Sequence, residues 1–198
     1  GFDWSPDSRW LTYSFAGTYE LAALKLYSLE ANESHQITEG DFNDSQPSFD
    51  PNGRFIYFLS HREFNPVYDN IYFDLNFPMG TRPFLVSLQK ETESPFVAQP
   101  KTPEEHPGRE QRMRNIKNRG KEKGGNVTVD LDGIQKRIAH FPVPEGRYTQ
   151  IRGTRDGALI ACEPVKGAMG NDWRSETPPA DRLLKLYDFG NQKFETIA

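Results

Sequence analysis

Residues 49–58 read FDPNGRFIYF, and residues 4–13 read WSPDSRWLTY. The second stretch lies 45 residues upstream of the first and matches it position by position. Residues 153–162, GTRDGALIAC, form a weaker third copy. In each copy a turn-forming run separates segments of aromatic or aliphatic residues, a pattern that predicts a β-hairpin. The sequence therefore predicts three copies of the same hairpin along the chain.

The three turns carry residues suited to tight reversals. Proline presets φ at the first central position of two copies, at Pro6 and Pro51, and Asp or Asn follows in all three copies. The next position is Ser8, Gly53 or Gly157, and φ often turns positive there. These residues favour a turn that joins antiparallel strands.

A second element follows each hairpin. Its copies are KLYSL (25–29), FLVSL (84–88) and KLYDF (185–189), and each precedes a polar turn and a short closing segment: HQIT (35–38), PFV (95–97) or FETI (194–197). Four short antiparallel strands at this spacing are typical of a propeller blade. We expect an all-β fold, a partial β-propeller of about three four-stranded antiparallel blades with two insertions. A β-sandwich with chance similarity between its hairpins is the alternative.

The repeat predicts the organisation of the chain. Blades are expected at 1–46, 47–98 and 148–198, with an aromatic insertion at 61–81, a mobile basic linker at 99–125, and a strand and connector that complete a blade at 126–147. Three blades do not close a ring, because propellers need about four to eight. We therefore expect the chain to be a piece of a longer protein, with its remaining blades supplied from outside.

Composition narrows the class of protein. The chain has 198 residues, and its aromatic content of 13% and its 15 prolines suit strands and turns. Its single cysteine, Cys162, excludes an internal disulfide, from which we expect a cytoplasmic location. No apolar run approaches the roughly 20 residues of a membrane span, so no membrane association is expected.

The two insertions differ in character. Residues 61–81 are rich in aromatics (Phe64, Tyr68, Tyr72, Phe73 and Phe77), which predicts a packed loop that lines a channel mouth, docks a domain or caps its blade. Residues 99–125 hold eight Lys or Arg against four Glu and few apolar residues, which favours a solvated loop over a basic nucleic-acid arm. No interleaved aromatics are present to stack bases, so we expect no nucleic-acid partner.

Residues 127–134, VTVDLDGI, alternate apolar and polar positions, as a half-buried strand does. Asp130 and Asp132 resemble the start of a calcium loop, but Gly133 follows Asp132 directly and breaks the pattern. We therefore expect a strand here and no metal site.

The sequence offers no catalytic constellation. It lacks a G-x-S-x-G elbow, an H-E-x-x-H zinc motif and a glycine-rich phosphate loop. Its four histidines (His35, His61, His106 and His140) are scattered, and Cys162 falls on a predicted strand where burial makes a thiol inert. We expect no catalytic residue and no cofactor in this chain.

Several segments resemble the propeller region of tricorn proteases and their bacterial homologues. They are residues 3–14, 47–77, 81–88, 94–96 and 129–148. The WSPDS turn alone is a weak signal, because TolB-like proteins and prolyl oligopeptidases share it. The aromatic insertion, the basic linker and the later VDLDGI segment together are much more specific, and the likeness spans residues 2–165.

The resemblance implies a function. Tricorn proteases are large serine peptidases that degrade peptides delivered by other proteases, and their propellers are thought to serve as passages. Their catalytic Ser and His lie in a C-terminal half that this chain does not include. The likeness implies part of the second propeller, with the remaining blades, the peptidase domains and peptides as partners, in a homo-oligomer.

Four residues in or beside the aromatic insertion are our candidates for the substrate channel: Arg62, Tyr68, Asp69 and Arg82. Arg62 or Arg82 is suited to pair with a peptide carboxylate through two hydrogen bonds. The alternative function is a stand-alone TolB-like propeller that acts as a protein-binding scaffold. The remainder of the reading frame distinguishes the two, since a downstream peptidase region is expected only for the first.

Overall fold

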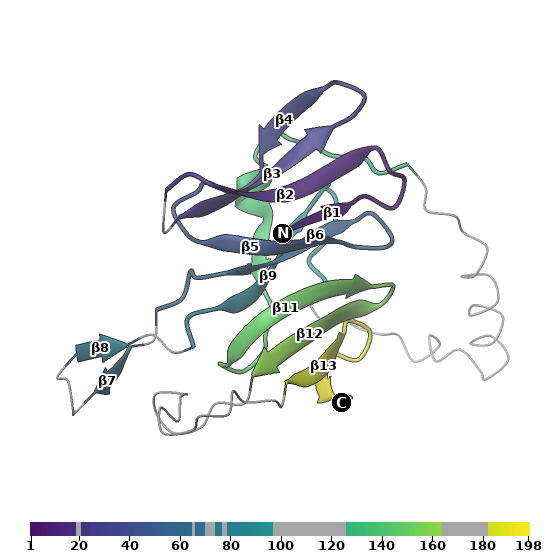
Figure 1. Cartoon of the computed structure of the whole chain (residues 1–198). Helices are drawn as coiled ribbons and strands as arrows, with labels where there is room; N and C mark the ends of the chain where they lie inside the picture. Colours follow the sequence, from purple (N-terminus) through teal and green to yellow (C-terminus); the bar gives the residue numbers. More distant parts are fainter. Residues whose placement is uncertain (19–20, 65, 70–73, 77–78, 97–125, 164–181) are drawn as a thin grey trace, which may run out of the picture.

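The fold consists of three four-stranded antiparallel sheets placed side by side in an arc that does not close (Figure 1). The computed structural model describes residues 1–18, 21–64, 66–69, 74–76, 79–96, 126–163 and 182–198. The strand orders are β1-β2-β3-β4, β5-β6-β9-β10 and β11-β12-β13-β14, and we call these sheets blades one, two and three. The expected all-β partial propeller of three blades is confirmed.

Each blade takes its strands in chain order. Blade one contains β1 (Phe2–Trp4), β2 (Trp10–Ala16), β3 (Ala22–Ser28) and β4 (Glu33–Gln36). Blade two contains β5 (Asp44–Phe49), β6 (Phe55–Ser60), β9 (Arg82–Ser87) and β10 (Ile138–His140). Blade three contains β11 (Arg147–Thr154), β12 (Gly157–Glu163), β13 (Leu183–Asp188) and β14 (Lys193–Thr196).

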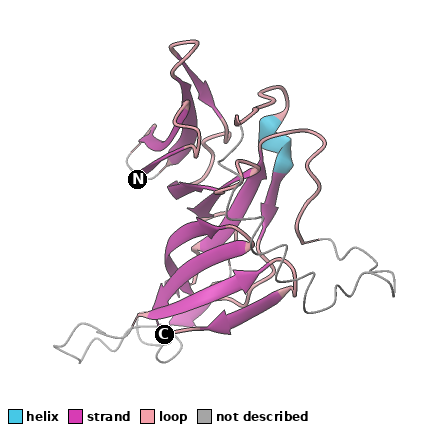
Figure 2. Cartoon of the chain, turned by 90° about the vertical axis from the view of Figure 1, so that its right-hand side faces the viewer, coloured by secondary structure: helices cyan, strands magenta, loops and turns pink. Residues whose placement is uncertain are grey.

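The first strands of the blades converge. Strand β5 contacts both β1 and β11, whereas the last strands, β4, β10 and β14, have no comparable contact with the described residues of another blade. Figure 2 shows the sheets one beside the next in a view turned by 90°. We call β1, β5 and β11 the innermost strands. Converging first strands and diverging outer strands are the geometry of a propeller built around an axis.

Two apolar clusters hold the blades together. Leu24 and Leu26 of blade one pack with Phe49, Ile56 and other residues of blade two. A second cluster joins blade two to blade three, and its members include Phe55, Tyr57, Phe141, Ile160 and Tyr187. The core therefore lies between the sheets, so each blade depends on its neighbours for burial.

The predicted hairpin turns are present, with one difference in backbone geometry. Ser8 and Gly53 have positive φ values of 59° and 70°. The expectation of a positive φ at Gly157 is wrong, since its φ is not in that range. Gly157 is needed for space instead, because a Cβ there would lie 1.9 Å from the carbonyl oxygen of Tyr187.

The expected fourth strand of blade two is misplaced. Pro95 and Phe96 of the PFV segment form a turn, and Val97 lies outside the described residues. Strand β10 takes the outer position instead, with Ile138, Ala139 and His140 paired to Val86, Leu85 and Phe84 of β9. Blade two is therefore completed from beyond residues 97–125.

The expected strand over 127–134 is also wrong. Residues 126–131 belong to no sheet, and the chain then turns at Gly133 (φ 68°) into the 3₁₀ helix η2 (Ile134–Arg137). The amide of Val127 donates to the Asp7 carboxylate, and the amide of Asp130 donates to the Leu88 carbonyl. The alternating pattern thus reflects a segment that packs against two blades without entering either sheet.

Residues 61–81 lie between β6 and β9 of blade two. Within this insertion, β7 (Val67–Asp69) and β8 (Asp74–Asn76) form a small hairpin that projects from one side of the arc (Figure 1). Phe64 is exposed, so it does not support the expected packed loop. Tyr72, Phe73 and Phe77, together with the linker 99–125, lie outside the described residues.

Candidate functional site

Three side chains at one repeat position meet where the innermost strands converge. The alignment that matches Trp4 with Phe49 and Gly153 also matches the residues just before them, which are Asp3, Ser48 and Arg152. They lie on β1, β5 and β11, one in each blade. We call these three residues the inner row.

Hydrogen bonds link the inner row across all three blades. Asp3 Oδ2 accepts from Ser48 Oγ at 3.2 Å and from the Phe49 amide at 2.9 Å. Ser48 Oγ in turn accepts from the Gly153 amide at 3.2 Å. Arg152 Nη1 lies 3.4 Å from Asp3 Oδ2. The row is therefore one polar network that fixes the innermost strands relative to each other.

The inner row is buried at its centre and open at its ends. Ser48 is 2% exposed, whereas the side chains of Asp3 and Arg152 are 29% and 63% exposed. The anion and the cation of the row neutralise each other. Such a surface offers a polar ligand hydrogen bonds without a strong net charge, which suits weak and reversible contact.

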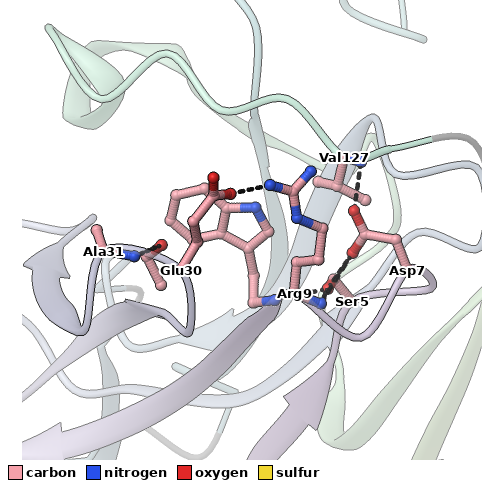
Figure 3. A network of polar contacts seen from close by, with 8 residues as sticks. Ser5, Asp7, Arg9, Glu30, Ala31 and Val127 are labelled. Carbon is pink, nitrogen blue, oxygen red and sulfur yellow. Dashed lines mark hydrogen bonds and ion pairs between the residues drawn. The ribbon is translucent and has the colours of Figure 1, made fainter.

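A second set of hydrogen bonds joins the turns between the first and second strands of the blades. Asp7 Oδ2 accepts from the Val127 amide at 2.6 Å, and Asp7 Oδ1 accepts from Ser5 Oγ, also at 2.6 Å (Figure 3). At the equivalent position of blade two, Asn52 Nδ2 donates to the Arg155 carbonyl at 2.7 Å. The corresponding residues Asp7 and Asn52 thus bind blade one to the segment at Val127 and blade two to the turn of blade three.

Burial raises the pKa of the Asp7 carboxyl, but its hydrogen bonds from Ser5 Oγ and from the amides of Val127 and Arg9 outweigh burial and lower the pKa. In Figure 3 the Arg9 side chain points away from this carboxylate and toward Glu30, with which it forms an exposed ion pair. Asp7 therefore stays ionised at neutral pH and serves the turn structurally.

The structure places the candidate Arg62 in an ion pair. Its Nε and Nη2 donate to the carboxylate of Asp44, and its Nε also donates to Ser60 Oγ at 2.9 Å. The guanidinium lies over the rings of Phe42, Phe58 and Phe84. Most of its donors therefore face protein, and its side chain is only 17% exposed.

Arg82 is similarly enclosed at the start of β9. Its Nη2 donates to the Val143 carbonyl at 3.1 Å, and its Nη1 lies 3.3 Å from Glu63 Oε2. Its Nε is buried and has no hydrogen-bond partner among the described residues. Beside it, His61 Nε2 and Thr81 Oγ1 form a hydrogen bond that joins the two ends of the insertion.

Tyr68 and Asp69 lie on β7, where their backbones pair with Leu75 and Asp74 of β8. The structure thus separates the four candidates into two groups. Arg62 and Arg82 lie at the base of the insertion, and Tyr68 and Asp69 lie on the projecting hairpin.

The described residues hold no metal-ligand cluster and one buried thiol. In the described ranges, no group of three or more His, Cys, Asp or Glu is placed to hold a metal ion. Cys162 is buried on β12, and burial raises the pKa of its thiol, as expected for an inert cysteine. No helix in the same ranges has the length and hydropathy to cross a membrane.

The inner row was not among the sequence-based candidates. Its signal was present in the repeat alignment, since Asp3, Ser48 and Arg152 hold one position of three copies. A repeat position that is polar or charged in every copy, between positions that are apolar or small, is a candidate for the exposed inner side of a blade.

Comparison with known proteins agrees with this geometry. The family model described as the tricorn protease second beta propeller domain matches residues 1–198. Tricorn protease homolog 1 of Streptomyces coelicolor is 36% identical over the whole chain, which spans 18% of that homologue.

Two solved structures show the same fold. The crystal structure of the tricorn protease matches 98% of the chain, with a TM-score of 0.73 and 23% identity, and the match spans 18% of that protein. TolB from Acinetobacter baumannii matches the whole chain, with a TM-score of 0.54 and 14% identity, over 31% of its own length.

Proposed function

This chain belongs to the family of tricorn protease second β-propeller domains, and we propose that it forms one arc of the second propeller of a longer serine peptidase. We call that longer protein the parent. In this proposal the arc guides or filters peptides toward a catalytic domain outside the chain. The length of the Streptomyces homologue supports a longer parent, since the chain spans only 18% of that homologue.

The open side of blade one supports a longer ring. Trp4, Leu11 and Tyr13 occupy the repeat positions of Phe49, Ile56 and Phe58, which are buried between blades one and two. In blade one this face is less buried, since Leu11 and Tyr13 are half-buried and Trp4 is 47% exposed. An apolar face at these positions is suited to a preceding blade, which the parent would supply.

The inner row is the main support for a role in peptide passage. Equivalent residues of three converging strands form one hydrogen-bonded polar row, whose two end members, Asp3 and Arg152, reach the surface. In a closed ring, such a surface lines the central passage. Its internal Asp3–Arg152 pair favours weak contacts, which a peptide in transit requires.

The four sequence-based candidates enter the proposal in two roles. Tyr68 and Asp69 are candidate contacts for a peptide or for an adjoining domain, because the hairpin β7–β8 projects from the arc. Arg62 and Arg82 are proposed to hold the base of that hairpin through Asp44 and Glu63.

We further propose that the substrates are peptides, that the parent is a homo-oligomer and that it is cytoplasmic. The first two derive from the family resemblance, and the location derives from the composition. The likeness to TolB is one of fold alone, and the match to the second-propeller family over residues 1–198 favours the peptidase over a stand-alone scaffold.

A blocking experiment on the parent tests the proposed passage. Gln150, exposed on the innermost strand β11, is replaced by Cys in a parent without other reactive cysteines, and a polyethylene-glycol maleimide is attached. Buried Cys162 is retained because its thiol is protected. We expect the adduct to slow hydrolysis of long peptides more than that of a short fluorogenic peptide, because a narrowed passage hinders the longer chain.

Two controls complete the experiment. Unmodified Gln150→Cys separates the adduct from the substitution, and the same adduct at Gln36→Cys, on the outer strand β4, separates blockage from modification in general. Equal rates for long peptides with and without the Gln150 adduct would exclude this ring from the substrate route.

A further inference from the structure

Two glutamines occupy one repeat position on neighbouring innermost strands. Gln46 lies on β5 and Gln150 on β11, at the offset that also relates Phe49 to Gly153. Both are exposed, and each lies two residues before a member of the inner row. The same side chain is therefore presented twice beside the proposed passage.

Both glutamines lie at irregularities in strand pairing. The register between β5 and β6 shifts between Ser45 and Ser48, and that between β11 and β12 shifts between Tyr148 and Gln150. A β-bulge changes the direction of the side chains beside it and is frequent next to binding sites. The two amides are thus displaced from the regular alternation of their strands at corresponding points.

The backbone of Gln46 is in an unfavourable conformation. Its φ is 52°, in the left-handed region that glycine adopts freely and that a residue with a Cβ adopts at a cost. No hydrogen bond within the described residues uses the side-chain amide of Gln46 or Gln150. Local structure therefore gives no reason for an amide side chain at either position.

The chemistry of the two side chains identifies a ligand. A primary amide carries a donor and an acceptor, the same pair that a peptide group presents. The charges of Asp3 and Arg152, in the adjoining inner row, offset each other. These groups match the main chain of an extended peptide better than any charged side chain.

We propose that Gln46 and Gln150 bind the peptide main chain by paired amide hydrogen bonds, so that recognition does not depend on the charge of the peptide's side chains. This inference rests on the proposed function, because it assigns a binding mode to the proposed passage. The bulges on β5 and β11 hold the two amides toward the ligand.

The test is equilibrium binding to the full-length parent, made inactive by substitution of its nucleophile. The probe is a fluorescein-labelled peptide of five Gly-Ala repeats with an amidated C-terminus, followed by fluorescence anisotropy. We expect Gln46→Ala and Gln150→Ala each to raise Kd about fivefold, since each removes neutral hydrogen bonds. Gln135→Ala, on η2 away from the inner row, serves as the matched control and should leave Kd unchanged.

Two further probes define the ligand group. A peptide with N-methylated backbone amides should bind wild type more weakly, and the double variant Gln46→Ala, Gln150→Ala should lose no further affinity for it. Peptides with Glu or Lys in place of Ala should show the same dependence on the two glutamines. A dependence that appears only with acidic or only with basic peptides would overturn the inference, as would no measurable binding of the probe to wild type.

Gln46→Gly separates binding from folding. Glycine relieves the left-handed backbone, so we expect a Tm equal to or above that of wild type together with the raised Kd. An unchanged Kd in this variant would overturn the role of the amide. If both alanine variants weaken binding while blockage at position 150 leaves turnover unchanged, the amide site stands and the proposed passage fails.

Discussion

Arg62 donates from Nε and Nη2 to the two carboxylate oxygens of Asp44, at 3.3 and 2.8 Å, although the Asp44 side chain is fully buried. Asp44 begins β5 and Arg62 follows β6 by two residues, so the pair joins the ends of two adjacent strands. The hairpin β7–β8 leaves blade two from this point. The ion pair therefore fixes the base of the aromatic insertion.

Loss of Arg62 should unfold this part of the propeller more readily. Arg62→Ala leaves a buried carboxylate without its partner, and we expect a loss of about 3–5 kcal/mol in the free energy of unfolding. Urea unfolding of the parent, followed by tryptophan fluorescence, measures it. Arg9→Ala, which breaks an exposed pair with Glu30, is the control and should cost at most about 1 kcal/mol. Unaltered stability with weakened peptide binding would instead make Arg62 a peptide contact.

The packing of blade two on blade three can be tested at a glycine. A Cβ on Gly153 would lie 2.5 Å from the Phe49 carbonyl oxygen and 2.8 Å from Tyr57 Cε2. We expect Gly153→Ala to destabilise the propeller by about 1–3 kcal/mol, since the two blades must separate to admit the methyl group. Gly17→Ala, where no atom lies within 4 Å of the new Cβ, is the control. Equal melting temperatures for the two variants would refute this close approach.

The hydrogen bonds of the Asp7 carboxylate predict a pH dependence of stability. Hydrogen bonds lower the pKa of the Asp7 carboxyl below its usual 3.8 despite partial burial. Its contribution is therefore complete above about pH 4 and is lost as the pH falls through the lowered pKa. The Tm difference between wild type and Asp7→Asn should accordingly be larger at pH 7 than at pH 3. Asp41→Asn, at an exposed position, controls for general charge effects, and a difference that does not change with pH would contradict the assignment.

Trp4 reports on the blade that is proposed to precede blade one. In this chain its side chain is 47% exposed, whereas its equivalent Phe49 is buried. If the parent covers this face, Trp4→Ala should destabilise the parent by about 3–5 kcal/mol, as for a buried aromatic residue. Leu29→Ala, exposed on the turn after β3, should have little effect. A Trp4 variant as stable as the Leu29 variant would mean that no blade covers this face.

The repeat made the fold predictable because its signals are local. Pro6, Pro51 and Gly53 fix the turns through their own backbone preferences, and the runs after them form β2 and β6. Placement of these hairpins in separate blades followed from the spacing of the copies. Such features depend on neighbouring residues, so a single sequence reveals them.

The misplaced elements depend on distant contacts. The alternation of residues 127–134 indicates burial on one side, but Val127 is buried against Gly53 and bound to Asp7, far away in sequence. Strand β10 has three residues and little pattern of its own, so its pairing with β9 was not visible. The Arg62–Asp44 pair was missed for the same reason, since a sequence does not show which distant charges meet.

In the proposed parent, the three blades are an arc of a closed ring, and the inner row lies on its passage. A cryo-electron-microscopy structure of the parent tests this claim directly. It should show a further four-stranded sheet against Trp4 and Phe15, and Asp3, Ser48 and Arg152 beside an open central passage. Solvent or a helical domain against Trp4, or an inner row sealed away from any passage, would contradict it.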